Sequence, residues 1–522
     1  MNAVKNYPQF GLVFLFVCLA STRVFAQSAT STEFRTWRDT GGETIAEAKL
    51  LGIEKGSEVL IQPRDTEEPM TVALVSLSPA DIYYVGESCF FGRGITQDQK
   101  QGIELISISA DQGLAQAQSN LGIIYQRGLG VDQDPKKALK YFRLAAEQGN
   151  AVAQYSLAVC YAEGIIVPQD LSQAVHYFRL AADKGYAAAQ YNLGLFYGNG
   201  LGVDKDLAKA VQLYVRAAEQ NHLLSQYALG LSYAGGSGVK QDHAEAVRYF
   251  NLAADKGYAP AQYELGRHYD LGLGVPKDQA RAMQYYLLAA DQGNADAQYN
   301  LAFCYAEGIV VAQDLKKAVE YFQMSAEQGN ADAQYELALC YAEGIVIAQD
   351  LKKAVEYYQM SAEQGNAKAQ VNLGLCYYEG AGVAKDLAKA VEYYQLAAEQ
   401  GQANAQYNLA LCYVDGTGVV KDLAKAVEYY QMSAEQGHAS AQFNLALCYV
   451  DGTGVVKDLA KAVKYYQMSA EQGDASAQYN LAIHYEEGTG VDRDLAKAVE
   501  YYQAAAAQGH LKALEVLRSL DK

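Results

Sequence analysis

The chain has 522 residues, and half of them are apolar, which excludes an intrinsically disordered protein. This length is too great for one ordinary globular core. The 60 acidic residues outnumber the 42 basic ones and give a net charge of −18 at pH 7. An acidic surface of this kind repels nucleic acid and anionic lipid, so the sequence predicts neither as a partner.

The N-terminus has the pattern of a secretory signal peptide. Lys5 precedes an apolar run over residues 10–20, and a small residue, Ala26, follows a short polar stretch. We interpret residues 1–26 as a signal that is cleaved between Ala26 and Gln27. The alternative is an uncleaved anchor, but the run is too short for a comfortable membrane span. No other long apolar stretch occurs, so we expect a periplasmic or secreted protein without a membrane span after cleavage.

Residues 27–32 form a polar leader, and the segment 33–82 then has the pattern of short strands. Trp37 lies in the first expected strand. The pairs Gly41-Gly42 and Lys55-Gly56 mark two turns. The expected strands span residues 33–39, 46–50, 59–61 and 70–75, with turns at 41–42 and 55–56. The sequence therefore predicts a small antiparallel β-barrel.

Three motifs in this segment resemble the Sla-one homology domain. They are Phe34-Arg35-Thr36-Trp37, Glu47-Ala48-Lys49-Leu50-Leu51-Gly52 and Leu77-Ser78-Pro79-Ala80-Asp81. The resemblance implies a compact barrel of the Src-homology-3 type that binds short peptides. No binding residue transfers by position, so the resemblance implies only a small docking module, packed directly against the first repeat.

From residue 79 the chain repeats with a period of 36 residues that never slips. The pair Ala117-Gln118 returns at 153–154, 189–190, 225–226 (as Ser-Gln), 261–262, 297–298, 333–334, 369–370, 405–406, 441–442 and 477–478. A fixed period of this length predicts a solenoid in which each unit buries its apolar face against its neighbours. We expect twelve repeats over residues 79–510, and we expect residues 511–522 to form a capping helix that turns Leu514, Leu517 and Leu520 toward the array.

Each repeat has the pattern of two helices, and residues 295–330 serve as the type unit. We expect helix A over 295–306, with Ala297, Leu301, Ala302 and Tyr305 on one face, and helix B with a buried side of Leu315, Ala318, Val319, Phe322 and Ala326. A Gly ends helix A in all twelve repeats, from Gly92 to Gly488. An Asp precedes helix B in all twelve, from Asp98 to Asp494, and is predicted to cap it.

This pattern resembles the Sel-one-like repeat, a relative of the tetratricopeptide repeat. The shared sequence is A-Q-Y-N-L-A/G-x-x-Y-x-x-G-x-G-V-x-x-D-x-x-K-A-x-x-Y-Y-x-x-A-A-E-Q-G, and the resemblance covers about residues 79–522. It implies a right-handed α/α superhelix that acts as an adaptor or scaffold, and many bacterial members are exported. Ile166, Val310 and Val346 replace the second loop glycine, and we expect a different local turn there.

Six cysteines fall at one repeat position, namely Cys160, Cys304, Cys340, Cys376, Cys412 and Cys448. Stacked helices lie about 8–10 Å apart, whereas a disulfide needs Cα atoms within about 7 Å. We therefore predict free, buried thiols, and we expect Cys89 to be unpaired as well. No spacing typical of a zinc site occurs.

Two rows of side chains on helix A are candidates for binding. In tetratricopeptide relatives helix A lines the concave groove. The first row follows the repeated Gln and comprises Tyr155, Tyr191, Tyr227, Tyr263, Tyr299, Tyr335, Tyr407 and Tyr479, with Val371 and Phe443 as variants. The second comprises Asn120, Asn192, Asn300, Asn372, Asn408, Asn444 and Asn480. Tyrosine gives a large contact area and asparagine can bond a peptide backbone. The competing interpretation is packing between repeats, which we favour for Tyr and leave open for Asn.

No group of residues has the pattern of a catalytic site. The seven His residues occupy different repeat positions, and the Gly-rich segment 235–238 is a loop without a preceding strand. We predict no enzyme activity, cofactor or metal. The first hypothesis is an exported scaffold that binds a protein or peptide partner, and the alternatives are a polysaccharide-binding protein and an envelope hydrolase. The oligomeric state does not follow from the sequence.

Overall fold

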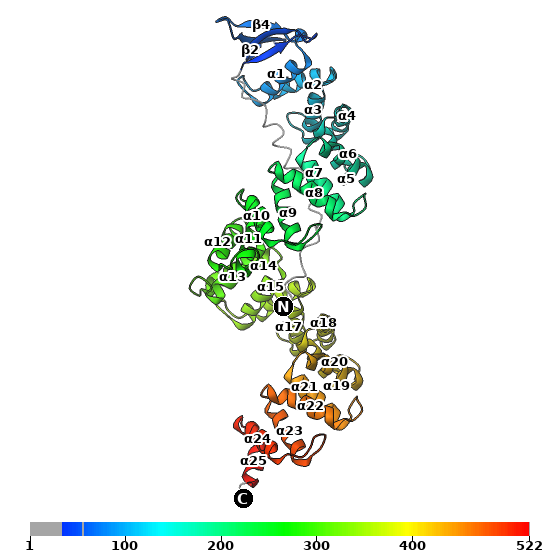
Figure 1. Ribbon diagram of the computed structural model, residues 1–522, viewed down its shortest axis with the longest axis vertical. Helices are drawn as coiled ribbons and strands as arrows, with labels where there is room; N and C mark the ends of the chain where they lie inside the picture. Colours follow the sequence, from blue (N-terminus) through cyan, green and yellow to red (C-terminus); the bar gives the residue numbers. More distant parts are fainter. Residues whose placement is uncertain (1–33, 55–56, 521–522) are drawn as a thin grey trace. The chain divides into compact units, whose positions relative to one another are not determined.

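The computed structural model describes residues 34–54 and 57–520. The expected signal peptide, the polar leader and the turn at 55–56 lie outside these residues. The chain divides into two compact units between Asp278 and Gln279. Figure 1 labels the helices and strands along the chain. The boundary falls inside the repeat 259–294, between its two helices.

The N-terminal strands form an open sheet, so the prediction of a closed barrel was wrong. The strands are β1 (Arg35–Arg38), β2 (Thr44–Glu54), β3 (Glu58–Pro63) and β4 (Met70–Ala73), followed by a 3₁₀ helix, η4 (Leu74–Ser76). They pair antiparallel in the order β1-β2-β3-β4, and an isolated bridge joins Asp39 to Leu77.

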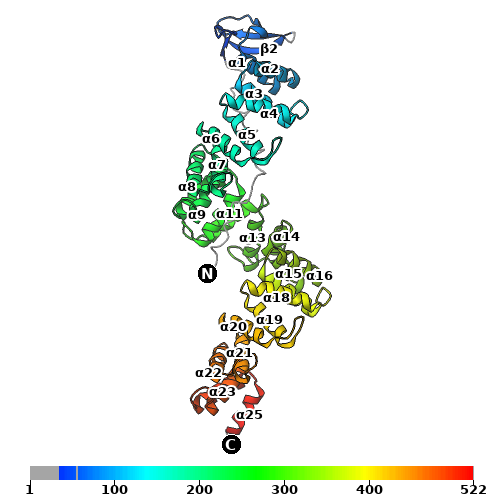
Figure 2. The same ribbon diagram turned by 90° about the vertical axis from the view of Figure 1, so that its right-hand side faces the viewer.

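The first repeat covers the apolar face of this sheet. The buried side chains of Trp37, Ala48 and Ile61 share one core with Ile82 of the first helix and Leu105 of the second. Figures 1 and 2 show the sheet beside these helices, labelled α1 and α2. Strand periodicity shows that one face of a sheet is apolar, but it does not show which element covers that face. The sequence therefore did not distinguish a closed barrel from an open sheet that is covered by helices.

One buried carboxylate joins β1 to α1 (Pro79–Phe91). Asp81 is 2% exposed, and it accepts hydrogen bonds from Arg35 Nη2 at 2.6 Å, from the Arg38 amide at 2.9 Å and from Ser78 Oγ at 2.6 Å. A buried charge is tolerated only when it is paired and bonded in this way. The sheet is therefore fixed to the solenoid by a specific contact as well as by apolar packing.

Replacing Asp81 with Ala is expected to destabilise this junction by about 3 kcal/mol, because it leaves Arg35 and two other donors without their acceptor. Trp37 is the only tryptophan and is fully buried, so its fluorescence reports on the junction. The measurement is the urea midpoint of the Trp37 red shift. Glu47→Ala, which removes an exposed pair with Arg64, is the control and should cost at most about 1 kcal/mol. An unchanged midpoint in Asp81→Ala would contradict the assignment.

Helices occupy the rest of the described chain and alternate between helix A and helix B of each repeat. In the first unit they are α1, α2 (Gln99–Asp111), α3 (Ala115–Arg127), α4 (Pro135–Glu147), α5 (Ala151–Glu163), α6 (Leu171–Asp183), α7 (Ala187–Asn199), α8 (Leu207–Glu219), α9 (Leu223–Gly235), α10 (His243–Ala254) and α11 (Ala259–Leu271). In the second unit they are α12 (Gln279–Ala290), α13 (Ala295–Glu307), α14 (Leu315–Glu327), α15 (Ala331–Glu343), α16 (Leu351–Glu363), α17 (Ala367–Glu379), α18 (Leu387–Glu399), α19 (Ala403–Asp415), α20 (Leu423–Glu435), α21 (Ala439–Asp451), α22 (Leu459–Glu471), α23 (Ala475–Glu487), α24 (Leu495–Ala507) and α25 (Leu511–Leu520).

The predicted helix ends are confirmed where the structure describes them. Gly308 is left-handed with φ +69°, and the Asp314 carboxylate accepts a hydrogen bond from the Lys317 amide at 3.1 Å. Asn221 replaces a glycine and is also left-handed, with φ +62°. A left-handed residue ends the helix, and the Asp oxygen satisfies a free amide at the start of the next helix.

The loops without the second glycine correct another expectation. Ile166, Val310 and Val346 have φ values of +74°, +67° and +67°, so they keep the left-handed turn that glycine adopts elsewhere. This conformation costs a non-glycine residue about 1–2 kcal/mol. The loop geometry is thus imposed by the packed helices on either side, and the sequence change alone does not alter it.

The core lies between helices A and B and between successive repeats. In the type unit Ala297, Leu301 and Phe322 are buried as expected, but Leu315 is 41% exposed because it lies in the first turn of helix B. At the C-terminus Ala513 is fully buried and Leu517 packs against the last repeat, while Leu514 is half-buried. The side chain of Leu520 lies outside the described part.

Candidate functional site

The fourth residue of each repeat from residue 115 onward is a buried glutamine, and all of these except Gln226 are seen to bond to the preceding repeat. Gln406 of α19 is 1% exposed, and its Nε2 donates to the carbonyl oxygen of Ala398, in the last turn of α18, at 3.2 Å. The same bond recurs at Gln118, Gln154, Gln190, Gln262, Gln298, Gln334, Gln370, Gln442 and Gln478. In the sequence this glutamine marks the period, and its recurrence in every repeat from residue 115 onward is the signal of its structural role.

The oxygen of the same amide is also bonded in most repeats. Gln436, at the end of α20, donates through Nε2 to Gln406 Oε1 at 2.7 Å. In the repeat 223–258 the position of Gln436 is held by Lys256, whose Nζ donates to Gln226 Oε1 at 2.8 Å. Gln154 is an exception, because its Oε1 is buried without a partner. An amide that is bonded on both sides, such as that of Gln406, links the end of the preceding helix B to the end of its own helix B. Buried polar groups that are satisfied on both sides fix one arrangement of the packed surfaces.

Replacing Gln406 with Leu is expected to destabilise the junction between α18 and α19 by about 1–3 kcal/mol, because the amide that serves both Ala398 and Gln436 is lost. The readout is the urea unfolding midpoint by circular dichroism. Gln431→Leu, which changes an exposed glutamine on α20, should stay within about 0.5 kcal/mol of the unmodified chain. Equal midpoints for both variants would rule out a structural role of the buried amide.

The tyrosine row lies between helices A and B and is engaged in packing. Tyr155 is 5% exposed, and the other tyrosines of the row are half-buried. Tyr407 lies 6.0 Å from the ring of Tyr430 and stacks on His438 at 4.7 Å. Tyr191, Tyr227, Tyr299, Tyr335 and Tyr479 make equivalent ring contacts with helix B, and Tyr263 lies under Arg267.

The asparagine row lies beside the junctions between repeats. Asn372, Asn444 and Asn480 donate through Nδ2 to a tyrosine hydroxyl of the preceding repeat, the first of them to Tyr358 at 3.2 Å. Asn192 bonds to Tyr155 in the same manner at 3.4 Å, and Asn120 is buried and bonds to Tyr83 and Glu87. Asn300 and Asn408 are half-buried. In Asn372, Asn444 and Asn480 one amide proton is thus used in stacking repeats, while the oxygen and the second proton can meet a partner.

A row of stacked tyrosine pairs, which the sequence analysis did not single out, closes the loop end of the repeats. Tyr413 and Tyr429 lie 5.8 Å apart and within 6° of parallel, and Lys425 Nζ lies 5.4 Å from the first ring. The pairs recur at Tyr125–Tyr141, Tyr161–Tyr177, Tyr233–Tyr249, Tyr305–Tyr321, Tyr341–Tyr357, Tyr377–Tyr393, Tyr449–Tyr465 and Tyr485–Tyr501. Their spacing of sixteen residues, from helix A to helix B, is visible in the sequence.

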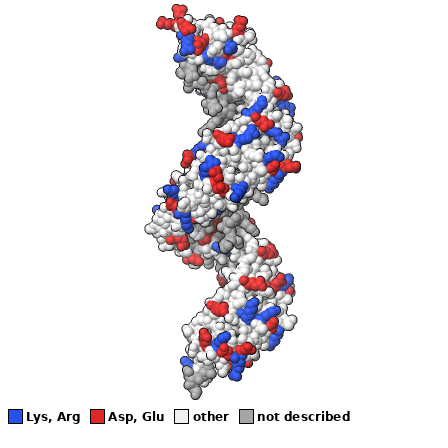
Figure 3. All heavy atoms as spheres, in the orientation of Figure 1, with Lys and Arg blue, Asp and Glu red and all other residues white. Residues whose placement is uncertain are grey.

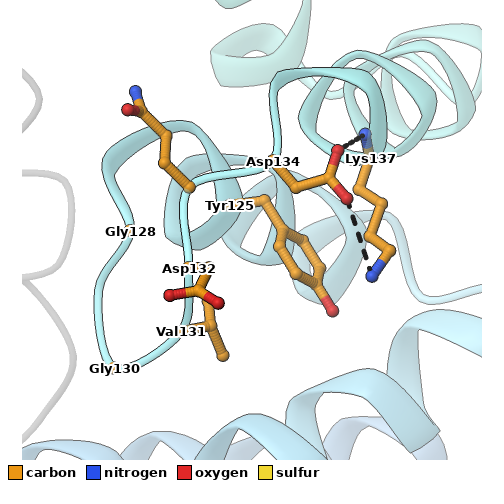
Figure 4. A pocket seen from close by; sticks show the side chains of 8 residues that line it. Tyr125, Gly128, Gly130, Val131, Asp132, Asp134 and Lys137 are labelled. Carbon is orange, nitrogen blue, oxygen red and sulfur yellow. Dashed lines mark hydrogen bonds and ion pairs between the residues drawn. The ribbon is translucent and has the colours of Figure 1, made fainter.

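A hollow at one such loop is shown in Figure 4. It is lined by Tyr125, the loop 128–133, Asp134 and Lys137. The Asp134 carboxylate accepts from the Lys137 amide at 3.0 Å and pairs with its Nζ at 3.6 Å, and the amide bond is the main reason why the pKa of Asp134 is lowered. Its carboxylate is thus engaged in capping α4, so this hollow is explained by loop geometry.

Two imidazoles face one another between α10 and α11. His268 is 1% exposed, its Nδ1 lies 2.7 Å from the Glu264 carbonyl oxygen, and its ring lies 5.6 Å from that of His243. Burial, and to a lesser extent His243 and Arg267, lower the pKa of His268 to about 4. Since Nδ1 must donate to a carbonyl, the neutral ring carries its proton there.

The stability of the first unit is therefore expected to fall as the pH drops from about 6.5 toward 4. The folded-state pKa of His268 lies below its unfolded value, so stability is fully present above pH 6.5 and is lost on acidification. The loss attributable to this ring is about 3 kcal/mol. His268→Cys, which introduces the residue found at this position in later repeats, should flatten the pH dependence, whereas exposed His176→Gln should not. Unfolding midpoints at several pH values test this, and identical slopes in all three chains would contradict it.

The cysteines are free, as predicted, throughout the part of the chain that the structure describes. Cys160, Cys340 and Cys412 are buried as expected, but Cys304, Cys376 and Cys448 are only half-buried. Burial raises the pKa of Cys160, Cys340, Cys376, Cys412 and Cys448 to about 11. A raised pKa keeps the thiolate fraction small at neutral pH and makes these thiols poorly reactive. Among the described residues there is no cluster of three or more His, Cys, Asp or Glu side chains that could hold a metal ion, and no helix is long and apolar enough to cross a bilayer.

Comparison with known proteins agrees with this architecture. The model of the Sel1 repeat matches residues 79–114, 115–150, 151–186, 187–222, 223–258, 259–294, 295–330, 331–366, 367–402, 403–438, 439–474 and 475–510. The chain belongs to the Sel1 repeat family. Sel1 repeat proteins are generally non-enzymatic scaffolds for protein interaction.

A solved structure shows the same fold, and a second is similar in sequence. A protective antigen present in uropathogenic Escherichia coli strains, which displays an SLR fold, is 38% identical over 80% of this chain and 90% of its own, with a TM-score of 0.68. A Sel1 repeat protein from Oxalobacter formigenes is 33% identical over 59% of this chain and 89% of its own, with a TM-score of 0.48. No curated protein matches the chain.

Proposed function

We propose that this chain is an exported scaffold that binds a protein or peptide partner along the exposed faces of its A helices. The observation that carries the proposal is the uninterrupted array of twelve Sel1 repeats. An array of this kind offers an extended surface and no deep closed pocket. In this proposal the array winds as a right-handed superhelix with the A helices on its concave side.

The exposed face of helix A has a chemistry that suits a polypeptide. The sixth, ninth and thirteenth residues of a repeat lie on one stripe of helix A, because they are spaced by three and four residues. In α17 they are Asn372, Leu375 and Glu379, and the middle residue is 42% exposed. An amide, an apolar side chain and a carboxylate in line can bond a backbone, contact a side chain and pair with a charge.

The tyrosine row favours a polypeptide over a polysaccharide. Stacking on a sugar needs a free ring face, whereas Tyr407 already stacks on His438 and contacts Tyr430. Tyr479 is held in the same way by His510 and Tyr502. The rings thus pack between helix A and helix B. In this proposal the partner contacts the stripe of sixth, ninth and thirteenth residues instead.

Export is supported by the signal-like residues 1–26 and by the description of the Escherichia coli relative as a protective antigen. The free thiols are compatible with an oxidising compartment because burial keeps them protonated. The N-terminal sheet serves in this proposal as a small docking module, as its resemblance to the Sla-one homology domain implies.

The test is site-specific photocrosslinking in the cell that produces the protein. A photoreactive amino acid replaces Leu375 or Leu411 on A helices, or Glu392 or Glu428 on B helices as matched controls. We expect discrete protein adducts from the A-helix positions, because these side chains lie on the proposed binding face. Adducts from the B-helix positions alone would overturn the proposal, and so would an absence of protein adducts combined with retention on purified cell-surface polysaccharide.

A further inference from the structure

The last residue of every A helix in the second unit is acidic. These residues are Glu307, Glu343, Glu379, Asp415, Asp451 and Glu487, and all six are exposed. In the first unit the same position holds Phe91, Arg127, Glu163, Asn199, Gly235 and Leu271. A uniform negative charge at this position is therefore a property of the second unit and not of the repeat as such.

The stability of the helices does not account for these acids. The C-terminus of a helix carries a partial negative charge, so a carboxylate there costs about 0.3–1 kcal/mol. The ion pairs found among the described residues of the second unit join Lys317 to Asp314 and Lys461 to Asp458, both at the start of a B helix. The last residue of helix A is also negatively charged whether it is a glutamate, as Glu379 is, or an aspartate, as Asp415 is. The position retains a carboxylate that the described fold does not use.

An apolar side chain stands one turn before each of these acids. The residues are Phe303, Leu339, Leu375, Leu411, Leu447 and Ile483, which are half-buried except for the more exposed Leu375. A ninth and a thirteenth residue are four apart and therefore neighbours on the helix surface. Each A helix of the second unit thus presents an apolar contact directly beside an exposed carboxylate.

Lysine and arginine match this pair of contacts. Both have an apolar stem that lies along apolar surface and a cationic head that stays in water. Placed on the stripe, the stem covers the ninth residue and the head reaches the thirteenth, where no cation of the described chain forms an ion pair with it. On the face seen in Figure 3, by contrast, basic and acidic groups are interspersed over the repeats.

We propose that the second unit binds an extended, cationic polypeptide segment of its protein partner along this stripe. The inference rests on the proposed function and names the chemistry of the partner. Each A helix of the second unit packs against the B helix of its own repeat and the B helix of the preceding repeat. A partner that runs along the A helices therefore meets one carboxylate in each successive repeat.

The test uses a fluorescein-labelled synthetic peptide with Lys at every third position and Gly and Ser between, titrated with the purified protein by fluorescence anisotropy. The stripe variant carries Glu307→Gln, Glu343→Gln, Glu379→Gln, Asp415→Asn, Asp451→Asn and Glu487→Gln. The control variant carries Glu320→Gln, Glu327→Gln, Glu356→Gln, Glu392→Gln, Glu428→Gln and Glu500→Gln, all on exposed positions of B helices. Both variants change the net charge equally, and circular dichroism verifies that both are folded.

We expect the stripe variant to bind the peptide at least about tenfold more weakly than the unmodified chain, and the control to differ by less than about threefold. Equal loss in both variants would show attraction by net charge alone and would overturn the proposal, as would unchanged binding in the stripe variant. Photocrosslinks from Leu411 that persist in the stripe variant would retain the scaffold function and reject the cationic segment. Their absence from the unmodified chain would reject the scaffold function itself.

Discussion

The array depends on a polar amide that is buried at the junctions between repeats and, at most of them, bonded on both sides, as Gln406 is. Apolar packing alone would allow neighbouring repeats of this chain to slide, because the surfaces in contact consist largely of alanine. The buried glutamine removes that freedom: its Nε2 must find a carbonyl of the preceding repeat, and its Oε1 must find a donor from its own repeat. A shifted register would leave a buried amide unsatisfied, at a cost of about 1–3 kcal/mol. The uninterrupted period of the chain is consistent with this requirement.

This junction determines which positions of helix A are buried in packing and which are left exposed. The third, fourth, seventh and eighth residues are consumed by packing, as Ala405, Gln406, Leu409 and Ala410 show in α19. The fifth contacts helix B, and the sixth reaches the hydroxyl of a preceding tyrosine in several repeats. The thirteenth is exposed in the second unit, and the ninth packs partly against the core and leaves the rest of its surface for the proposed partner. Adding a repeat therefore lengthens the binding stripe without changing the fold, so the chain can gain contacts by duplication alone.

The helical part of the fold could be predicted because each of its features is local and recurs. Asp314 before helix B and Gly308 after helix A act within a few residues of their own positions. The N-terminal sheet could not be distinguished from a barrel, because the residues that cover it, such as Ile82 and Leu105, belong to helices whose placement is tertiary.

The same limit applies to single positions within the repeat. The left-handed turn at Val310 is imposed by neighbouring helices, and no local rule permits it for a branched residue. The tyrosine and asparagine rows of the candidate site can be seen in the sequence. That the tyrosine rings pack against helix B is seen only from their contacts in the structure. The buried role of Gln406 required the structure, since an exposed and a buried glutamine look alike in a sequence.

The most direct test of the glutamine junction is hydrogen exchange of the unmodified chain, resolved to the amides of α18 and α19. Amides that are joined into one cooperative unit open together, with equal opening free energies. The account predicts that the last turns of α18 and the body of α19 agree to within about 1 kcal/mol. Exchange in α18 that is about a hundredfold faster than in α19, or more, would contradict it, because it would show that the repeats open independently at the bond from Gln406 to Ala398.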